Sequence, residues 1–391
     1  MSKIDKLLEG VKVEWMTLER IALKISSGGT PNTSVSTYYN GNIPGLRTQE
    51  VGSGDIWDTG VKISELGLEN SSAKMIPVNC VIIAMYGATV GKVGINKIPL
   101  CTNQACANIH LDEEIVNYRY VYHFLLSQYE YIKSLGAGSQ TNINAQIVKK
   151  LQIPIPCPNN PEKSLTIQKE IVRILDTFTE LTAELTAELT ARKKQYEYYR
   201  EQLLSFEEGE VEWKTLGGVA ENLDSMRKPV TSGLRESGNI PYYGASGIVD
   251  YVKDYIFDGD FLLVSEDGAN LVARNTPIAF SISGKTWVNN HAHVLKFKTY
   301  AGRRFVEYYL NSIDLNPYIS GAAQPKLNQK NLNNIKIPMP SNAEQARIVS
   351  ILDKFDTLTT SLTEGLPKEI ELRKKQYEYC RDKLLTFPKP E

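Results

Sequence analysis

Several short motifs resemble catalytic signatures, and each lacks a residue that its chemistry needs. A Walker A phosphate loop requires a glycine five positions before the Gly284-Lys285-Thr286 run, but Ala279 stands there. The run Gly87–Lys92 has one spacer residue too few for the same loop. Asn316–Tyr318 lacks the second proline of the Asn-Pro-Pro-Tyr box of adenine methyltransferases. The sequence therefore predicts no catalytic site on this chain.

Metal-binding residues are also incomplete in the sequence. His291 and His293 would lie on the same face of a strand, but no third ligand accompanies them. Cys101 and Cys106 lack the second pair that would complete a zinc site. The chain has five cysteines, an odd number that indicates free thiols rather than a disulfide framework. The sequence therefore predicts no metal site.

Polar residues suited to reading DNA gather in two stretches rich in Gly, Tyr, Asn and Thr. Arg and Lys side chains pair with guanine, Asn and Gln pair with adenine, and both classes bind phosphate. The candidates in the first stretch are Arg47, Thr48, Gln49, Lys92, Asn103, Gln104, Ser139, Gln140 and Asn142. Those in the second are Tyr242, Tyr243, Ser246, Arg274, Lys285, Asn289, Asn290, His291, Gln324 and Lys326. Any one of them has an alternative as an ordinary solvated loop residue, but their clustering in two matching stretches favours DNA binding.

Both stretches carry the pattern of a mixed α+β domain. Strand-type runs such as Cys80–Met85 and Asp260–Val264 are bounded by turn residues. Helical patterns follow at Tyr118–Leu135 and Arg303–Ile313. We predict a first domain over residues 1–160 and a second over 209–340, with helices over 161–208 and 341–391.

The two halves of the chain are copies of one plan. Four motifs recur in the same order: Val13–Trp15 as Val211–Trp213, Leu151–Pro156 as Ile335–Pro340, Ile171–Phe178 as Ile348–Phe355, and Arg192–Arg200 as Arg373–Arg381. The last pair is identical at eight of nine positions. The joint that follows the first helix is rebuilt by the C-terminal and N-terminal segments together. We therefore expect a pseudo-twofold internal repeat with the two termini close in space.

Each helix carries an apolar seam with the 3-4 spacing of a coiled coil. Its members are Ile171, Ile174, Phe178, Leu181 and Leu185 in the first helix, and Ile348, Ile351, Phe355, Leu358 and Leu362 in the second. Because such a stripe needs a partner, we expect the two helices to pack antiparallel. A break or kink is predicted near Gly365 and Pro367.

A four-residue unit, Thr-Ala-Glu-Leu, occurs twice in residues 182–189. One interpretation is a helix surface built from good helix formers. The other is a molecular ruler, in which each added unit would move the flanking domains by about 6 Å along the axis.

Composition agrees with an ordinary globular protein, at 42% hydrophobic and 23% charged residues. The net charge of −1 argues mildly against a general nucleic-acid binder, although a local basic patch can hide in a neutral average. No run of about 18 apolar residues occurs, and Met1–Lys12 lacks the apolar stretch of a signal peptide. We therefore expect a cytoplasmic location and no membrane association.

These features together resemble the specificity subunit of type I restriction–modification systems, over essentially the whole chain. The duplicated plan, the Thr-Ala-Glu-Leu units and the Arg-Lys-Lys-Gln-Tyr-Glu-Tyr runs carry the resemblance, and the units point to the IC subgroup. Further segments look like the entries of two kinds of target-recognition domain: Gly29–Pro31 with Asn40–Pro44 in the first half, and Tyr243–Ile248, Glu266–Gly268 and Trp287–His293 in the second.

The resemblance implies a non-catalytic subunit that recognises an asymmetric bipartite site in double-stranded DNA. Each domain would dock in the major groove, and the helices would bind two modification subunits, which carry S-adenosylmethionine and methylate a flipped adenine. Restriction subunits, acting as motor-nucleases with ATP and magnesium, would join the same complex. No cofactor is expected to bind this chain directly.

Two other classes of protein remain open at this point. A structural coiled-coil adaptor would use its globular parts to bind protein, and would show no salt-dependent DNA binding. An enzyme such as a fused methyltransferase would bind S-adenosylmethionine itself. The missing cofactor motif argues against the enzyme.

Overall fold

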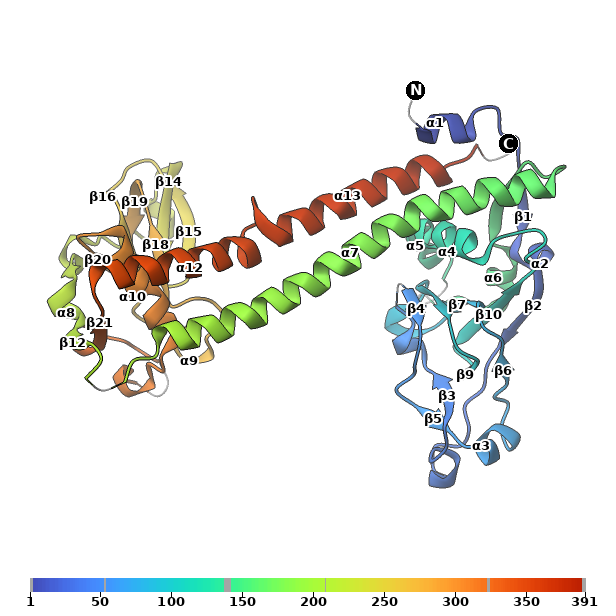
Figure 1. The fold of residues 1–391 in the computed structure, drawn as a ribbon, viewed down its shortest axis with the longest axis horizontal. Helices are drawn as coiled ribbons and strands as arrows, with labels where there is room; N and C mark the ends of the chain where they lie inside the picture. The colour runs from blue at the N-terminus through green and yellow to red at the C-terminus, as the bar shows by residue number, and fades with distance from the viewer. Residues whose placement is uncertain (1–2, 53, 137–141, 208, 322–323, 389–391) are drawn as a thin grey trace. The chain divides into compact units, whose positions relative to one another are not determined.

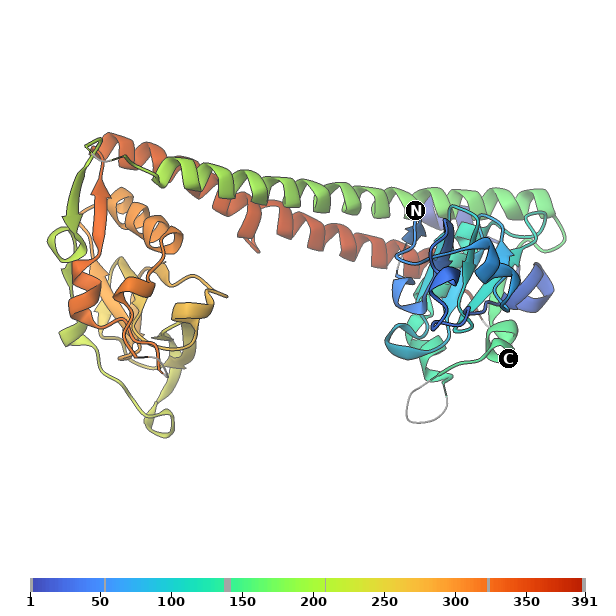
Figure 2. The same cartoon turned by 90° about the horizontal axis from the view of Figure 1, so that it is seen from below.

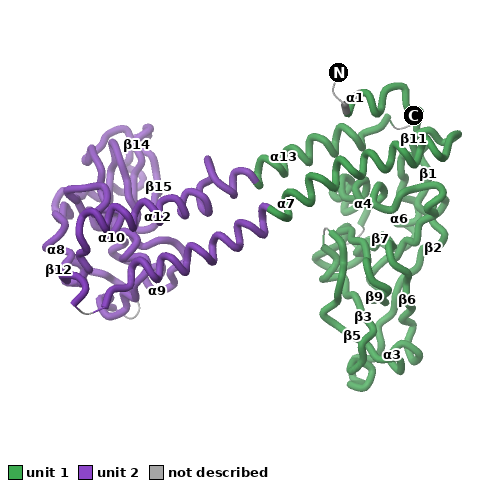
Figure 3. The backbone as a smooth tube through the Cα atoms, viewed as in Figure 1, with its two compact units in different colours: residues 1–184, 370–391 green, residues 185–369 purple. Residues whose placement is uncertain are grey.

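The computed structural model describes residues 3–52, 54–136, 142–207, 209–321 and 324–388 (Figure 1). The chain divides into two compact units (Figure 3). The first unit contains residues 1–184 and 370–391, and the second contains residues 185–369. Both long helical segments of the chain cross from one unit to the other, so each unit holds part of each.

The first unit contains mostly short strands and helices. Its strands are β1 (Val13–Thr17), β2 (Ala22–Ser27), β3 (Ile43–Leu46), β4 (Gly54–Ile56), β5 (Lys62–Ile63), β6 (Met75–Ile76), β7 (Val81–Ala84), β8 (Val93–Asn96), β9 (Leu100–Thr102), β10 (Cys106–Leu111) and β11 (Gln152–Pro156). Its short helices are α1 (Lys3–Leu8), α2 (Leu18–Ile21), η1 (Ser36–Tyr38), η2 (Thr48–Glu50), α3 (Glu65–Glu69), η3 (Gly87–Thr89), α4 (Tyr118–Ser127), α5 (Tyr129–Ser134) and α6 (Ala145–Lys150). The strands form one sheet in the order β2-β10-β7-β8-β4, another in the order β5-β3-β9-β6, and the pair β1-β11.

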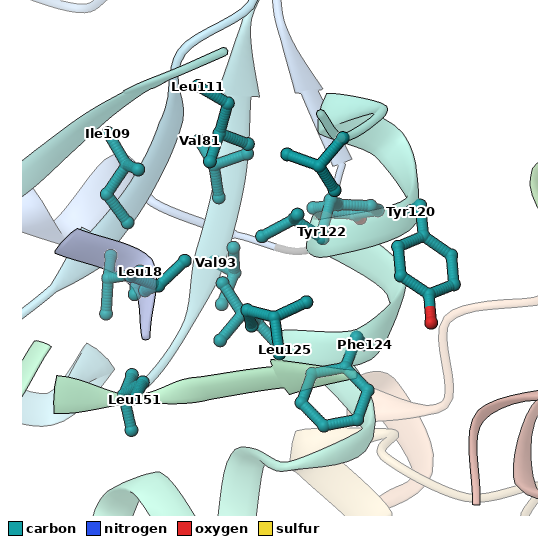
Figure 4. Close-up of a cluster of buried hydrophobic side chains, with 14 of the residues drawn as sticks. Leu18, Val81, Val93, Ile109, Leu111, Tyr120, Tyr122, Phe124, Leu125 and Leu151 are labelled. Carbon is teal, nitrogen blue, oxygen red and sulfur yellow. The ribbon is translucent and has the colours of Figure 1, made fainter. Parts of the chain in front are cut away.

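The core of the first unit lies between the larger sheet and α4. The Asn117 side chain caps α4 by accepting the backbone N–H groups of Arg119 and Tyr120. Residues Tyr120 to Leu125 of this helix are buried. Figure 4 shows Phe124 and Leu125 in the same apolar cluster as Val81 of β7 and Val93 of β8. The helical pattern predicted over Tyr118–Leu135 is confirmed but divided between α4 and α5, and burial of the apolar face of α4 stabilises it.

The second unit repeats this plan with different side chains. Its strands are β12 (Glu212–Thr215), β13 (Glu221–Asn222), β14 (Ser237–Gly244), β15 (Gly247–Val252), β16 (Phe257–Asp258), β17 (Phe261–Ser265), β18 (Ala279–Ile282), β19 (Lys285–Val288), β20 (Ala292–Lys296) and β21 (Lys336–Met339). Its short helices are α8 (Leu216–Val219), η4 (Asp224–Met226), η5 (Ser232–Leu234), α9 (Asn270–Ala273), α10 (Tyr300–Ser312), η6 (Asn316–Tyr318) and α11 (Gln329–Asn334). The sheets run β13-β20-β17-β18 and β15-β14-β19-β16, and β12 pairs with β21.

Within each unit, two of the recurring motifs form strands that pair with each other. Strand β1 pairs antiparallel with β11, with Trp15 opposite Pro154. Strand β12 pairs with β21 in the same way, with Trp213 opposite Pro338. In both units the second sheet is mixed, because β3 runs parallel to β9 and β14 runs parallel to β19. The duplication predicted from sequence therefore extends to sheet topology.

The long helices are α7 (Pro161–Leu204), α12 (Asn342–Thr360) and α13 (Gly365–Leu385). In the first unit, Ile171 and Leu175 near the start of α7 share a core with Leu384 and Leu385 near the end of α13. Figure 2 shows this part of α7 lying along the globular part of the unit. The second unit has the matching arrangement, in which the start of α12 shares a core with Leu204. The start of each helical segment thus packs with the end of the other, as expected for an antiparallel pair.

The predicted break in the second helical segment is confirmed, and one predicted seam residue is wrong. Helix α12 ends at Thr360 and α13 begins at Gly365. Leu362 lies in the intervening loop, with 77% of its surface exposed, so it does not continue the seam. Leu366 and Ile370 are the buried residues that follow the loop. The remaining seam positions lie in helices, from Ile171, which is fully buried, to Leu181, which is partly exposed.

The predicted closeness of the termini is confirmed by contacts within the first unit. The Trp15 indole N–H donates to the carbonyl of Pro388 at 2.9 Å. Ile4, Leu7 and Leu8 of the N-terminal segment pack against the same core as Leu384. Among the described residues, the structure contains no helix with both the length and the apolar character needed to span a membrane.

Candidate DNA-reading loops and helix anchors

Two loop clusters form at the same place in the two domains, where the parallel strand pair ends. After β9, the backbone N–H of Asn103 donates to the carbonyl of Leu46 at 3.0 Å. After β19, the backbone N–H of Asn289 donates to the carbonyl of Tyr243 at 3.1 Å. Each asparagine then turns the chain with its own side chain: Oδ1 accepts the backbone N–H two residues later, at Ala105 or at His291.

Neighbouring loops join these turns through matching backbone hydrogen bonds. The Met85 N–H donates to the carbonyl of Ala105 at 2.8 Å, and the Glu266 N–H donates to that of His291 at 2.9 Å. A hydroxyl adds another link in each domain, from Thr89 to the carbonyl of Thr48 and from Ser265 to that of Ala245. We call residues 47–50, 87–89, 103–105 and 142 the first loop cluster. Residues 244–247, 266–268, 289–291 and 324–327 form the second loop cluster.

In the first loop cluster, some of the predicted DNA-contact residues are exposed and others hold the loops. Arg47, Gln49 and Gln104 are exposed. The Gln104 side chain is positioned by the Thr30 hydroxyl, 2.7 Å from its Oε1. Asn142 is half-buried, and its Oδ1 accepts the N–H of Gly87.

Two other predicted residues of this cluster are better explained as structural. Thr48 is 7% exposed, so the prediction that its side chain contacts DNA is wrong. Asn103 uses Oδ1 to shape its turn. Ser139 and Gln140 lie outside the described residues.

The second loop cluster divides in the same way. Ser246, Asn290, His291, Gln324 and Lys326 are exposed there, and Tyr243 is half-buried. The prediction for Tyr242 is wrong, because the residue is 1% exposed and the N–H of Val230 donates to its hydroxyl. Asn289 is likewise buried and serves its turn.

Three predicted basic residues lie outside the loop clusters. Lys92 lines a cavity with residues of α7 and α13 in the first unit. The guanidinium of Arg274 donates to the carbonyl of Ile313 at 2.7 Å and so holds the end of α10. Lys285 begins β19, at the strand end opposite Asn289, with Nζ 4.5 Å from the ring centre of Tyr255. The sequence could not distinguish these residues from those in the loop clusters, because the residue type alone does not show where a side chain points in the fold.

A buried ionic network lies beneath the second loop cluster. Possible ligand atoms of Asp224, Glu266 and His293 lie within 4.8 Å of one another. His291, the other histidine of the pair noted in the sequence, is not part of this cluster and pairs with Asp267 at 2.9 Å. Arg227 already fills the position of a cation, because its Nη1 lies 2.6 Å from Glu266 Oε2 and its Nη2 lies 3.4 Å from Asp224. His293 bonds the carbonyl of Leu327 through Nε2 at 2.7 Å.

The carboxylates of this network are held in their ionised form. Burial is the largest single effect on Asp224 and opposes its ionisation, but the hydrogen bonds from His293 and the Val294 N–H, together with the charge of Arg227, lower the pKa. Burial also opposes ionisation of Glu266, and the ion pair with Arg227 lowers its pKa. We therefore interpret the cluster as an ion-pair network that fixes the loops rather than as a metal centre.

Chelation of divalent metals tests this interpretation. Because Arg227 balances the carboxylates, EDTA is expected to change the Tm of the full chain by less than about 1 °C. The measurement is a thermal melt with and without EDTA. A structural metal would instead make the Tm fall by several degrees on chelation and recover with added zinc.

A second pair of equivalent polar clusters ties each domain to its helices. In the first, Arg119 Nε lies 2.7 Å from Asp176 Oδ2, and His123 Nε2 lies 2.7 Å from Asp176 Oδ1. Arg119 also pairs with Asp55 at 2.9 Å. Helix α4 is thereby joined to α7. We call Arg119, His123 and Asp176 the first anchor.

The second anchor has the same geometry with one substitution. Arg304 Nη2 lies 2.8 Å from Asp353 Oδ1, and the hydroxyl of Tyr308 donates to the same oxygen at 2.6 Å. Tyr308 thus takes the place of His123, and a further hydroxyl, that of Tyr300, donates to Asp353 Oδ2 at 2.7 Å. We call Arg304, Tyr308 and Asp353 the second anchor.

Both anchor carboxylates are stabilised as anions. Burial opposes ionisation of Asp176, but hydrogen bonds with His123 and Arg119 lower its pKa. Burial likewise opposes ionisation of Asp353, and bonds from Tyr308, Tyr300 and Arg304 lower its pKa. Neither Asp176 nor Asp353 is among the site residues predicted from the sequence. The available signal was an acidic side chain at the same position of both copies of an apolar helical motif.

A tyrosine from the other long helical segment contacts the first anchor and another packs beside the second. Tyr377 of α13 lies with its hydroxyl 3.3 Å from His123 Nδ1. In the second unit, Tyr196 of α7 stacks on Phe355 with ring centres 6.1 Å apart. Burial raises the pKa of each tyrosine to about 12. The two tyrosines occupy the same position of the repeated Arg192–Arg200 motif.

Comparisons with known proteins agree with this architecture. The sequence matches the family described as the type I restriction modification DNA specificity domain over residues 11–192 and 208–372. It is 37% identical over 380 residues to the Escherichia coli type I restriction enzyme EcoprrI specificity subunit, covering 93% of this chain and 92% of that protein. It is 36% identical over 418 residues to the E. coli EcoR124I/EcoR124II specificity subunit, covering 100% of this chain and 98% of that protein.

A solved structure shares the fold over its full length. The type I restriction-modification system S subunit of M. genitalium is similar with a TM-score of 0.64 at 19% identity, covering 100% of both chains. The resemblance drawn from the repeated motifs is confirmed by the family match. The chain therefore belongs to the family of type I restriction–modification specificity subunits.

Proposed function

We propose that this chain is the DNA-reading subunit of a type I restriction–modification complex. Residues 1–160 and 209–340 are its two target-recognition domains, and residues 161–208 and 341–391 are its spacers. The observation that carries the proposal is that both domains expose amide and basic side chains at the same topological place. Because the exposed side chains differ between the domains, the target is an asymmetric bipartite site.

Base selection is assigned to the exposed members of the loop clusters. In the first domain these are Arg47, Gln49 and Gln104, and in the second Asn290 and His291 are the main candidates. Arg suits guanine and the amides suit adenine in the major groove. Asp267 lies 2.9 Å from Nδ1 of His291, so Nε2 is the nitrogen available to a base or phosphate. Each domain would read about 3 to 5 base pairs, with the half-sites about one helical turn apart.

Partner binding is assigned to the long helices because both helical segments carry the same exposed sequence motif. Tyr198 and Tyr379 hold the same position in the two Arg-Lys-Lys-Gln-Tyr-Glu-Tyr runs, and they are 59% and 65% exposed. Two equal surfaces suit two copies of one partner. The partners would be two modification subunits that supply S-adenosylmethionine and methylate adenine. Restriction subunits would add ATP- and magnesium-dependent cleavage.

Methylation sequencing of a methylation-free host tests the proposed function. The host would express this chain with its cognate modification subunit, and a control host would express the modification subunit alone. We expect a bipartite motif methylated at adenine that is absent from the control. No new motif, from a modification subunit shown to be active with another specificity chain, would favour the coiled-coil adaptor.

A further inference from the structure

The two units are joined by two helical paths of unequal length in residues. Path one runs along α7 from Asp176 of the first anchor to Tyr196, which stacks on Phe355 beside the second anchor, 20 residues later. Path two runs from Asp353 of the second anchor to Tyr377, which contacts the first anchor, 24 residues later. Whatever the separation of the units, both paths must span it. Four extra helical residues would make path two longer by about 6 Å.

The loop at residues 361–364 removes this difference. These four residues lie between α12 and α13, outside any helix. Without them, path two contains 21 helical residues, 353–360 and 365–377, and path one also contains 21, residues 176–196. The second path is four residues longer than the first, and the structure leaves four residues of the second path outside the helix.

The loop is closed by local contacts that suit its sequence. The hydroxyl of Ser361 accepts the backbone N–H of Glu364 at 3.0 Å. Gly365 has φ +80, and a Cβ there would lie 2.4 Å from the carbonyl oxygen of Thr357. The chain thus doubles back on the last turn of α12, which only glycine permits. Pro367 follows in the first turn of α13, where its missing N–H costs little.

The four-residue spacing of apolar side chains continues without interruption across residues 361–364, although these residues are not helical. Leu358, Leu362, Leu366 and Ile370 are spaced by four, as are Leu181, Leu185 and Leu189 of α7. Leu362 is the exposed member, at 77%, whereas Leu366 and Ile370 are buried. The second path therefore holds one four-residue unit more than the first, and that unit is the part left out of the helix.

We propose that residues 361–364 are a length reserve that keeps the second path matched to α7 and opens when α7 is lengthened. Four residues stretched out span about 13 Å, more than the 6 Å or so that one inserted helical unit requires. Opening needs no new helix, so Pro367 does not oppose it. This inference rests on the proposed function in one respect: α7 sets the gap between the half-sites.

Three variants test the reserve in the complex with the modification subunit. The insertion variant carries one extra Thr-Ala-Glu-Leu unit after Leu189. The continuous variant lacks residues 361–364 and carries Gly365→Glu and Pro367→Thr, which gives its second path the spacing of α7 without a loop. The combined variant carries both changes. The measurements are the Tm of the complex and the gap in the methylated motif.

The insertion variant is expected to keep its Tm within about 2 °C and to methylate a site with a longer gap and unchanged halves. The continuous variant should keep the native gap. The combined variant, which has no reserve, should lose at least tenfold in methylation and more than about 5 °C in Tm. A combined variant as stable and as active as the insertion variant would overturn the proposal.

Two further outcomes can be distinguished from a failure of the length reserve. If no chain directs methylation, the unmodified one included, the proposed function fails, whereas the Tm pattern still decides on the reserve. If the continuous variant does not fold, hydrogen exchange over residues 357–366 of the insertion variant decides instead. Faster exchange there than in the unmodified chain supports opening of the loop, and unchanged exchange contradicts it.

Discussion

Replacing Asp353 by Asn is expected to lower the free energy of unfolding of the second unit by about 3 kcal/mol. The carboxylate pairs with Arg304, whose side chain is 13% exposed, and accepts the hydroxyls of Tyr308 and Tyr300. Removing the negative charge leaves a largely buried guanidinium with less compensation. Asp176→Asn should have the same effect on the first unit, because Arg119 and His123 lose the same partner.

The pH dependence of this effect has a definite sign. Because the folded-state pKa of Asp353 is lowered, its contribution is fully present above the unfolded pKa of about 3.9. It is lost as the pH falls through the folded pKa. The difference in stability between the unmodified chain and Asp353→Asn should therefore be constant near pH 7 and shrink below about pH 4.

Urea denaturation of the full chain measures the change in the free energy of unfolding. Hydrogen-exchange rates in α10 and α4 then report the effect on each anchor separately. Asp353→Asn should accelerate exchange in α10 more than in α4, and Asp176→Asn should do the reverse. Asp258→Asn is the matched control, since Asp258 is exposed in β16 of the second unit, and its effect should stay within about 0.5 kcal/mol. Equal effects from Asp353→Asn and the control would contradict the assignment of the anchor.

Gln104→Ala is expected to relax recognition at one base pair in the half-site of the first domain. The Gln104 side chain is exposed beside the turn that Asn103 holds, and a bidentate amide contributes about 1 to 3 kcal/mol of discrimination. Relative methylation of the wrong base should rise about ten- to a hundredfold at that pair. Asn290→Ala, at the equivalent position of the second domain, should relax one pair of the other half-site.

Methylation of a library with each base pair varied in turn measures this effect. Asn103→Ala is the informative comparison, because Asn103 shapes the loop. It should weaken methylation of all sequences that use the first domain without changing which bases are preferred. Loss of preference in both half-sites from Gln104→Ala alone would show that the residue acts on the fold and not on a base.

The sequence by itself determined the duplication, the helices and the break near Gly365. Each of these is written as a local pattern: a motif that recurs, an apolar residue every three or four positions, a glycine and a proline together. The family followed from the same patterns, since the repeated helical motifs are specific.

Only the tertiary structure decided which polar residues are presented and which hold the fold. Tyr242 has the residue type of a DNA contact but lies in the interior. The Asn103 side-chain oxygen accepts a backbone N–H within its own turn. The anchor partners are far apart in the sequence, 57 residues between Arg119 and Asp176 and 49 between Arg304 and Asp353. Local periodicity carries no information about contacts at such separations. These contacts are set by how each domain folds back onto its helix.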